Sequence, residues 1–410
     1  MREKKDVLFL CQYFYPEYIS SATLPYDTAK ALVKSGLKVD TICGYPKEYN
    51  KSNDVPLKEH LNGINIRRLK YLQLGRASFI GRLINYFSFT FVSLLHIRKM
   101  KSYKVIIVYS NPPVLPLIAA WAKKLFNTKI VFVSYDVYPE IAYRTNSISE
   151  DSFISKMMNK VNATVFKHVD KVVALSSEMK RFLLKNRDGI NNDSVEVIPN
   201  WYEDKGLVNS TISNESKFFS FKNDGDVVIS YFGNMGTSQD LATLLNAIRA
   251  LSGDSRIKFL FAGHGNKMDS LRNSIKRENL HNVTVYDFLH GDDYQDALRT
   301  SDCFVVTLED GLTGLAVPSK TYAYMMAGKP IISIMGTHSD ISEDLKQNYA
   351  GYAVEVGDEL SLVKAIEELR DNPIQRGEMG RNARDLYLKK YTTEICTNQY
   401  VKMIKNLLGD

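Results

Sequence analysis

Residues 7–42, VLFLCQYFYPEYISSATLPYDTAKALVKSGLKVDTI, decide the fold class of this chain. The continuous apolar run 7–10 is typical of a strand buried on both faces of a sheet. A loop over 12–21 separates it from a helical pattern at 23–35, which stops at Gly36. Residues 37–42 are again apolar enough for a strand. Strand, loop, helix and strand in this order predict a βαβ unit and a parallel sheet.

The same alternation continues along most of the 410 residues, which is too long for one α/β core. A polar stretch over 201–225 interrupts it, and a second series of strands begins at residue 227. We therefore predict an α/β protein with two Rossmann-like, doubly wound domains that face each other across a cleft. The first covers 1–200, the linker 201–225 and the second 226–392, and a last helix over 393–410 can return to the first domain.

The charge of +7 is unevenly distributed along an otherwise ordinary globular composition. One stretch without any acidic residue contains Arg67, Arg68, Lys70, Arg76, Arg82, Arg98, Lys99, Lys101 and Lys104. Such a patch suits an anionic surface, for example a membrane or a phosphate-bearing lipid. No nucleic-acid motif accompanies it, so nucleic acid is not expected as a partner. A solvated basic face is the alternative interpretation.

The longest uncharged apolar stretch, LINYFSFTFVSLLHI at 83–97, lies inside this basic region. It is shorter than the roughly 20 residues that a membrane span needs. Its basic flanks favour a helix at a membrane interface, and a buried helix is equally compatible with the pattern. No signal peptide is expected, because the first six residues are charged. The four cysteines form no CxxC pair, which argues against a zinc site.

Three short segments follow predicted strands of the second half, where an open α/β sheet binds its ligands. They are Gly233–Gly236, Gly263–Gly265 and the segment Val317-Pro318-Ser319-Lys320, which opens a helix. Lys320 would occupy the first helical turn, where a cation opposes the helix dipole unless an anion lies between them. A dinucleotide oxidoreductase would need G-x-G-x-x-G after the first strand, and that loop has no glycine. A P-loop and a Ser-His-Asp signature are also absent from the sequence.

Together these segments resemble those of the family 4 retaining glycosyltransferases, which have the GT-B fold. The motifs are Gln12–Glu17 (QYFYPE), Ser110–Pro113 (SNPP), Asp136–Glu140 (DVYPE), Leu175-Ser176, Ile198–Trp201 (IPNW), Gly233–Gly236 with Gln239, and Gly311–Pro330 (GLTGLAVPSKTYAYMMAGKP). The resemblance extends over essentially the whole chain. It is strongest toward bacterial surface-polysaccharide transferases of the N-acetylfucosamine-transferase type.

The chain departs from the family pattern at several positions. A ribose-gripping Glu of many members is Ala323 here, and its partner Glu is Leu315. The loop after the first strand of the second half offers Asn234 and Gln239 instead of basic residues. A His common before the DVYPE motif is Tyr135.

The resemblance implies transfer of an N-acetylated hexosamine or deoxyhexosamine from a UDP-sugar to a polyprenyl-pyrophosphate-linked saccharide. The product would belong to a capsule, O-antigen or exopolysaccharide, and the enzyme would lie at the cytoplasmic face of the plasma membrane. No metal and no other cofactor is expected. Two alternatives remain: a non-catalytic GT-B subunit that stabilises another transferase, and a hydrolase or epimerase acting on the UDP-sugar.

The resemblance and the positions after strands together define three sets of candidate site residues. The catalytic set is Asp136, Glu140 and Lys320, although Asp136 can instead cap the turn that follows it. The donor-binding set is Gly233, Asn234, Gly236, Gln239, Gly263, Lys267, Phe288, Leu289, Glu309, Gly314, Leu315, Pro318, Ser319 and Thr321. The acceptor-binding set is Tyr13, Ser21, Asn111 and Tyr135.

Overall fold

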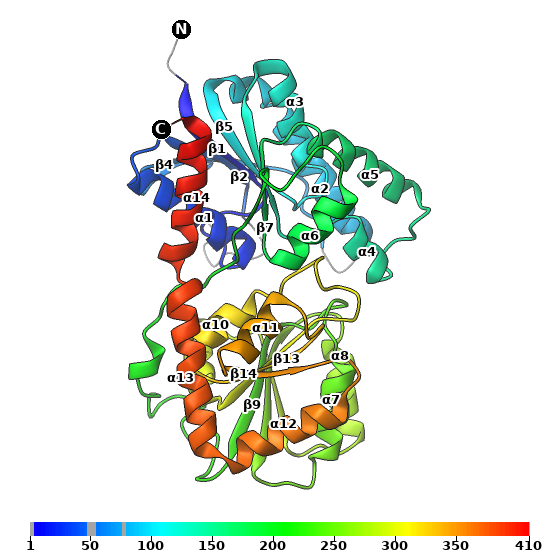
Figure 1. Cartoon of the computed structure of the whole chain (residues 1–410), viewed down its shortest axis with the longest axis vertical. Helices are drawn as coiled ribbons and strands as arrows, with labels where there is room; N and C mark the ends of the chain where they lie inside the picture. Colours follow the sequence, from blue (N-terminus) through cyan, green and yellow to red (C-terminus); the bar gives the residue numbers. More distant parts are fainter. Residues whose placement is uncertain (1–3, 47–54, 76–78, 410) are drawn as a thin grey trace. The chain divides into compact units, whose positions relative to one another are not determined.

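A computed structural model of the chain describes residues 4–46, 55–75 and 79–409, and it divides into two compact units (Figure 1). Unit 1 consists of Met1–Asn200, Gly314–Val317 and Thr393–Asp410, and unit 2 of Trp201–Thr313 and Pro318–Thr392. The polar stretch 201–225 is thus grouped with unit 2, where Phe218 is buried. Arg76 of the predicted basic patch lies outside the described residues.

Unit 1 is built on an eight-stranded sheet in the order β3-β4-β2-β1-β5-β6-β7-β8. All neighbouring strands are parallel except β3 and β4, which form an antiparallel hairpin. The strands are β1 (Lys5–Cys11), β2 (Val39–Gly44), β3 (Lys58–Leu61), β4 (Ile64–Leu69), β5 (Tyr103–Tyr109), β6 (Lys129–Ser134), β7 (Lys171–Ala174) and β8 (Val195–Val197).

The helices of unit 1 cover this sheet, and the last helix of the chain is among them. They are α1 (Ser20–Lys34), α2 (Phe79–Leu94), the 3-10 helix η1 (Ile97–Ser102), α3 (Pro116–Phe126), α4 (Glu140–Arg144), α5 (Phe153–Phe166), α6 (Ser177–Asn186) and α14 (Thr393–Leu408). Helix α14 lies beside α1 (Figure 1). It buries Cys396 and Tyr400, so its amphipathic pattern is satisfied within unit 1.

Unit 2 is built on a six-stranded, wholly parallel sheet in the order β11-β10-β9-β12-β13-β14. Its strands are β9 (Val227–Asn234), β10 (Ile257–His264), β11 (Val283–Asp287), β12 (Cys303–Thr307), β13 (Ile331–Ile334) and β14 (Gly351–Val354). Its helices are η2 (Leu207–Asn209), α7 (Ala242–Ala250), α8 (Met268–Arg277), α9 (Gly291–Thr300), α10 (Lys320–Met326), α11 (Asp340–Gln347), α12 (Glu359–Asp371) and α13 (Pro373–Lys390).

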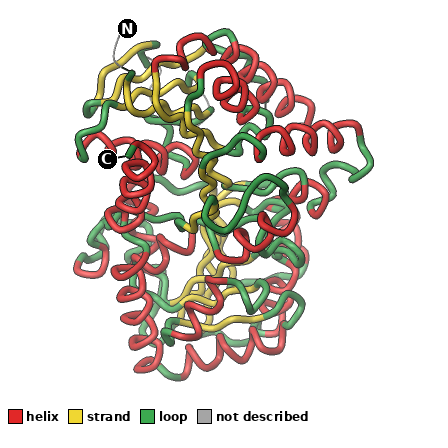
Figure 2. The backbone as a smooth tube through the Cα atoms, turned by 45° about the horizontal axis from the view of Figure 1, so that its top comes forward, coloured by secondary structure: helices red, strands yellow, loops and turns green. Residues whose placement is uncertain are grey.

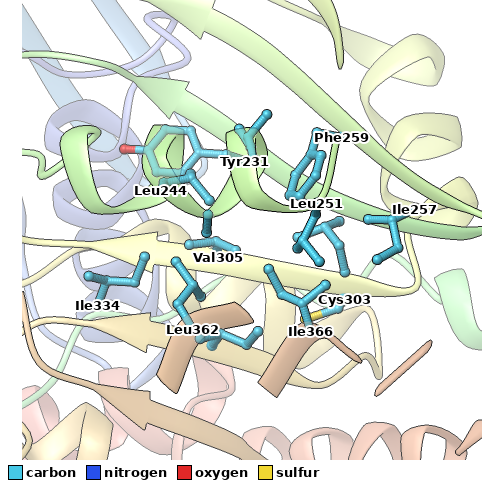
Figure 3. Packing of buried hydrophobic residues seen from close by; sticks show 14 of the residues in the cluster. Tyr231, Leu244, Leu251, Ile257, Phe259, Cys303, Val305, Ile334, Leu362 and Ile366 are labelled. Carbon is cyan, nitrogen blue, oxygen red and sulfur yellow. The ribbon is translucent and has the colours of Figure 1, made fainter. Parts of the chain in front are cut away.

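The helices of each unit lie outside its strands (Figure 2). In unit 2, side chains of β9, β10 and β12 meet those of α7 and α12, and Tyr231, Phe259 and Ile366 belong to this core (Figure 3). These strands are buried along nearly their whole length, as expected for parallel strands covered on both faces. The core fixes the carboxyl ends of the strands, where the candidate site lies.

The prediction of two doubly wound α/β domains is confirmed by the two sheets. The sequence interpretation missed the hairpin of β3 and β4, together with α4, α11 and β14. The hairpin turn contains Asn62 and Gly63, both with positive φ, and Asn-Gly is the dipeptide that such turns favour. This Asn-Gly signal is present in the sequence, but a hairpin does not fit the alternation of strands and helices on which the interpretation was based.

Candidate functional site

The candidate donor site lies at the point of the unit 2 sheet where the strand order reverses. Strand β9 has β10 on one side and β12 on the other. In open parallel sheets, ligands bind beyond the carboxyl ends of strands at such a point. The loops that leave β9, β10 and β12 here carry most of the predicted donor-binding residues.

Lys320 is the cation of this site, and it has no carboxylate partner among the described residues. Its Nζ donates to the carbonyl oxygen of Asn234 at 3.3 Å and lies 3.7 Å from the ring centroid of Tyr231. Burial lowers the pKa of Lys320 well below its ordinary value. An aromatic face stabilises a desolvated ammonium by about 2 kcal/mol. This gain is smaller than the cost of removing the ammonium from water, which is several kcal/mol. The site is therefore electrostatically suited to an anion.

Helix α10 holds Lys320 in place through Tyr324, one turn further along. The Tyr324 hydroxyl accepts a hydrogen bond from the Phe232 N–H at 2.7 Å and donates to the Phe232 carbonyl at 3.1 Å. Its ring stacks on Phe304 with centroids 4.1 Å apart. Sequence reasoning did not include Tyr324 in the site, because its contribution is to position α10 against β9.

The loop after β9 is tied by the side chain of Gln239. The Gln239 Oε1 accepts a hydrogen bond from the Gly236 N–H at 2.9 Å, and Asn234 Nδ2 lies 3.5 Å from the same oxygen. Gly263 on β10 lies in register with Gly233. A Cβ at Gly263 would come within 1.8 Å of the Gly233 carbonyl oxygen, so no other residue fits there. The predicted residues Gly233, Asn234 and Gly236 thus lie together at the end of β9 and the start of the loop that follows it.

Lys267 and Glu309, both predicted to bind the donor, pair with each other. Lys267 Nζ lies 2.5 Å from Glu309 Oε1 and donates to the Gln239 carbonyl at 2.6 Å. The pair ties the start of α8 to the loop after β12. Its charges compensate each other, which sets Lys267 apart from Lys320.

An aromatic row extends from the carboxyl end of β10 to the start of α9. The rings of His264 and Phe288 have centroids 5.2 Å apart, and those of Phe288 and His290 4.7 Å apart. Burial, together with the charge of Lys320, lowers the pKa of His264. Leu289 is buried between the two aromatic positions. Sequence reasoning placed Phe288 and Leu289 here but missed the histidines, although His264 stands between Gly263 and Gly265.

The segment from Gly314 to Thr321 is divided between the two units. Gly314 and Leu315 are grouped with unit 1, and the Leu315 carbonyl accepts a hydrogen bond from the Val137 N–H at 2.9 Å. Pro318, Ser319 and Thr321 belong to unit 2. The Thr321 hydroxyl is buried and donates to the Pro318 carbonyl at 2.8 Å, which fixes the first turn of α10.

The positions that carry a Glu pair in many family members are apolar and buried. Ala323 lies inside α10, and Leu315 is packed within unit 1. A carboxylate at Ala323 would need a partner in an environment that includes the buried Tyr322 and Tyr324.

In unit 1 the candidate residues lie near the carboxyl ends of β1, β5 and β6, where the strand order also reverses. Asp136 follows β6, and its backbone N–H donates to Ser110 Oγ at 3.2 Å. Its carboxylate has no hydrogen-bond partner among the described residues, and burial raises its pKa to about 6. It lines a small pocket with Ser110, Ser134 and Arg187. The structure gives no hydrogen bond from this side chain to a following turn.

Glu140 differs from Asp136 because it is paired. Arg187 Nη2 lies 2.6 Å from Glu140 Oε2 and donates to the Tyr138 carbonyl at 3.1 Å. The Arg187 side chain is only 8% exposed, so this pair stabilises the turn between β6 and α4.

The four predicted acceptor residues occupy different environments in unit 1. Tyr13 is buried in the loop after β1, and Ser21 is the second residue of α1. Asn111 has a buried Oδ1 without a hydrogen-bond partner among the described residues. Tyr135 packs against Tyr109 with centroids 5.1 Å apart, and burial raises its pKa well above the ordinary value.

No group of three or more His, Cys, Asp or Glu side chains in the described part of the chain has the arrangement of a metal site. The four cysteines are buried, and none of them forms a disulfide. In the same residues, no helix combines the length and apolarity that crossing a membrane requires.

Two protein-family models match the chain, one in each half. The model described as "Glycosyltransferase Family 4" matches residues 22–205, and "Glycosyl transferases group 1" matches residues 213–386. The chain is a family 4 glycosyltransferase. It therefore uses a nucleotide-sugar donor, and its two units are the halves of a GT-B fold.

Individual relatives of this glycosyltransferase are distant in sequence. The Pseudomonas aeruginosa protein named "Probable glycosyltransferase WbjE" is 24% identical over 75% of each chain. Among solved structures, sucrose-phosphate synthase from Thermosynechococcus elongatus superposes with a TM-score of 0.72 at 15% identity, covering 99% of this chain and 100% of that one. Anabaena Alr3699/HepE in complex with UDP-glucose gives 0.73 at 14% identity, covering 98% and 100%. These structures establish the fold.

Proposed function

We propose that this glycosyltransferase moves a sugar from a UDP-sugar to a lipid-linked saccharide during assembly of a surface polysaccharide, with retention of anomeric configuration. An N-acetylated hexosamine or deoxyhexosamine is the proposed sugar, because the sequence motifs resemble those of N-acetylfucosamine-type transferases. A UDP donor is supported by the structural likeness to HepE, which was solved with UDP-glucose. The proposed location is the cytoplasmic face of the plasma membrane.

The observation that carries the proposal is the unpaired ammonium of Lys320. A diphosphate bound beside the loop Gly233–Gly236 would supply the counterion that the described residues lack. Negative charge grows on the diphosphate as the bond to the sugar breaks. A preorganised cation at that place stabilises the transition state more than the ground state. No divalent cation is required by this arrangement.

We assign the acceptor side of the reaction to unit 1. Asp136 is a carboxylate that no described residue neutralises, and it stands at the carboxyl edge of the sheet. With a pKa of about 6 it is ionised at neutral pH and can accept a hydrogen bond from an acceptor or donor hydroxyl. The acceptor hydroxyl replaces the diphosphate on the same face of the sugar. Its proton passes to the departing phosphate, so no protein nucleophile is needed.

A second candidate function is a non-catalytic subunit, and the buried Ala323 and Leu315 favour it because they remove the family's ribose-gripping pair. The ammonium of Lys320, which has no carboxylate partner among the described residues, favours a donor-binding enzyme instead. One measurement separates the two functions, because only the enzyme has to bind UDP.

The test is calorimetric titration of the full chain with UDP. We expect Lys320→Met, which keeps most of the side chain but removes its charge, to weaken UDP binding by about 10- to 100-fold, the value of one charge-assisted hydrogen bond. The matched control is Lys364→Met, at an exposed position of α12, which should bind like the wild type. EDTA should leave the affinity unchanged.

Two outcomes would contradict the proposal. If Lys320→Met bound UDP as tightly as the wild type, the diphosphate would lie elsewhere. If the wild type bound no UDP, thermal-shift measurements with GDP- and dTDP-sugars would distinguish another donor from the non-catalytic subunit.

A further inference from the structure

Helix α2 carries large apolar side chains on its outward side, while the side that packs on unit 1 is mixed in polarity. The residues that face inward include Asn85, Phe89 and Ser93, all buried. The residues that face outward recur at helical spacing: Ile80 is 69% exposed, Phe87 44%, Phe91 62% and, just past the last turn, Leu95 67%. An ordinary amphipathic surface helix instead has polar and charged residues on its outward side. No charged residue lies between Arg82 and Arg98 to interrupt the outward side.

The loop before α2 extends this apolar surface. The Leu72 N–H donates to Ser88 Oγ at 2.8 Å, and the Leu74 N–H donates to Asn85 Oδ1 at 2.7 Å. The loop is thereby held along α2, yet both leucine side chains are exposed. We call the combined surface the α2 patch; it consists of Leu72, Leu74, Ile80, Phe87, Phe91 and Leu95. Contiguous exposed apolar patches of this kind mark interaction surfaces.

Basic residues lie next to both ends of the patch. Arg98, Lys99 and Lys101 are exposed on η1, directly after α2, and Lys70 and Arg82 are exposed near its beginning. Partial desolvation, together with the charges of Arg67 and Lys58, lowers the pKa of Lys99. Residues 67–104 hold nine of the 53 basic residues of the chain and none of its 46 acidic ones.

We propose that the α2 patch is the surface with which this chain binds an anionic lipid bilayer. A lipid bilayer matches both halves of the observation, because its acyl region accepts the apolar side chains and its anionic headgroups accept the basic rim. Helix α2 has 16 residues and cannot cross a bilayer, so it lies in the interface plane. The inference deepens the proposed membrane location, but it uses no donor-site residue.

The direct test is co-sedimentation of the full chain with vesicles of phosphatidylcholine containing about 30% phosphatidylglycerol. We expect binding to fall at least about tenfold in Phe87→Ser/Phe91→Ser and in Arg98→Glu/Lys99→Glu/Lys101→Glu. The matched controls are Leu360→Ser/Ile374→Ser and Lys276→Glu/Lys364→Glu/Lys389→Glu, which change exposed residues of unit 2 and should bind like the wild type. Pure phosphatidylcholine should bind at least about tenfold more weakly.

A tryptophan probe locates the contact. The fluorescence of Phe91→Trp should shift to the blue on addition of the anionic vesicles, whereas that of Ile374→Trp should not change. Thermal unfolding and UDP affinity are measured on every variant, so that loss of the fold or of donor binding is recognised separately.

The proposal is overturned if the wild type does not sediment with anionic vesicles. It is also overturned if light scattering shows a dimer that Phe87→Ser/Phe91→Ser dissociates, because the patch would then be covered by a second copy. Equal loss of vesicle binding in the control variants would likewise remove the α2 patch as its cause.

Discussion

The carboxyl edges of the two sheets carry opposite charges in the same kind of environment. In unit 1, Asp136 is a partly buried carboxylate without an ion pair among the described residues, and its pKa rises to about 6. In unit 2, Lys320 is an ammonium without a carboxylate beside it, and its pKa falls well below the ordinary value. Desolvation causes both shifts, and each makes the charged form costly until a ligand compensates it.

The neighbours of these two residues show that the protein pairs its charges elsewhere. Glu140 is bound by Arg187 close to Asp136, and Lys267 is bound by Glu309 beside the loop after β9. Perturbed, uncompensated groups cluster at functional sites because their strain is relieved by substrate. We therefore expect Asp136 and Lys320 to meet substrate and the paired candidates Glu140, Lys267 and Glu309 to shape the site.

The largest effect is expected from removing the unpaired cation. Lys320→Ala should lower turnover at least about 100-fold, because its charge acts on the diphosphate as it departs. The paired double variant Lys267→Met/Glu309→Gln should cost less than about tenfold, since it removes two charges that already cancel. Turnover is measured as UDP release from the UDP-sugar that gives the largest thermal shift. If the double variant were as impaired as Lys320→Ala, the pair would itself bind the diphosphate.

The next largest effect is expected from replacing Asp136, which should lower the activity but raise the stability of the protein. Asp136→Asn should lower kcat/KM about tenfold or more and abolish its rise with pH near 6. The same change should increase the free energy of unfolding at pH 8 by at most about 3 kcal/mol. The folded carboxyl has the higher pKa, so the wild type loses stability as pH rises from about 4 to about 6. Urea unfolding at pH 5 and pH 8 measures this difference.

The paired carboxylate of unit 1 is the control for that experiment. Glu140→Gln leaves the buried Arg187 without its counterion, so unfolding should become easier by about 1.5–3 kcal/mol, the value of a hydrogen bond to a charged group. Its kcat/KM should keep the wild-type pH dependence. A stabilised Glu140→Gln, or a destabilised Asp136→Asn, would reverse the assignment of paired and unpaired roles.

The sequence predicts the fold and the place of the site, because both follow from local patterns. The start of α10 was predicted correctly, since the segment before Lys320 marks where that helix begins. Whether a charge is paired depends on loops that meet only after folding. Lys267 and Glu309 are 42 positions apart and lie on different elements. No spacing rule joins them, so the sequence alone does not show that Lys267 is paired with a carboxylate and Lys320 is not.

The smallest expected effect is proton uptake on UDP binding, and it is also the effect most specific to Lys320. In the free enzyme the pKa of Lys320 is depressed, and a bound diphosphate should raise it. Near and above the free-enzyme pKa, UDP binding should therefore take up a fraction of a proton. The affinity for UDP is expected to be greatest below the pKa of Lys320 in the free enzyme. It should fall as the pH rises from that value through the pKa of Lys320 in the UDP complex. Calorimetry in two buffers of different ionisation enthalpy measures the uptake. Lys320→Met should abolish it, while His264→Asn should retain it; uptake that survived in Lys320→Met would assign the proton to His264 instead.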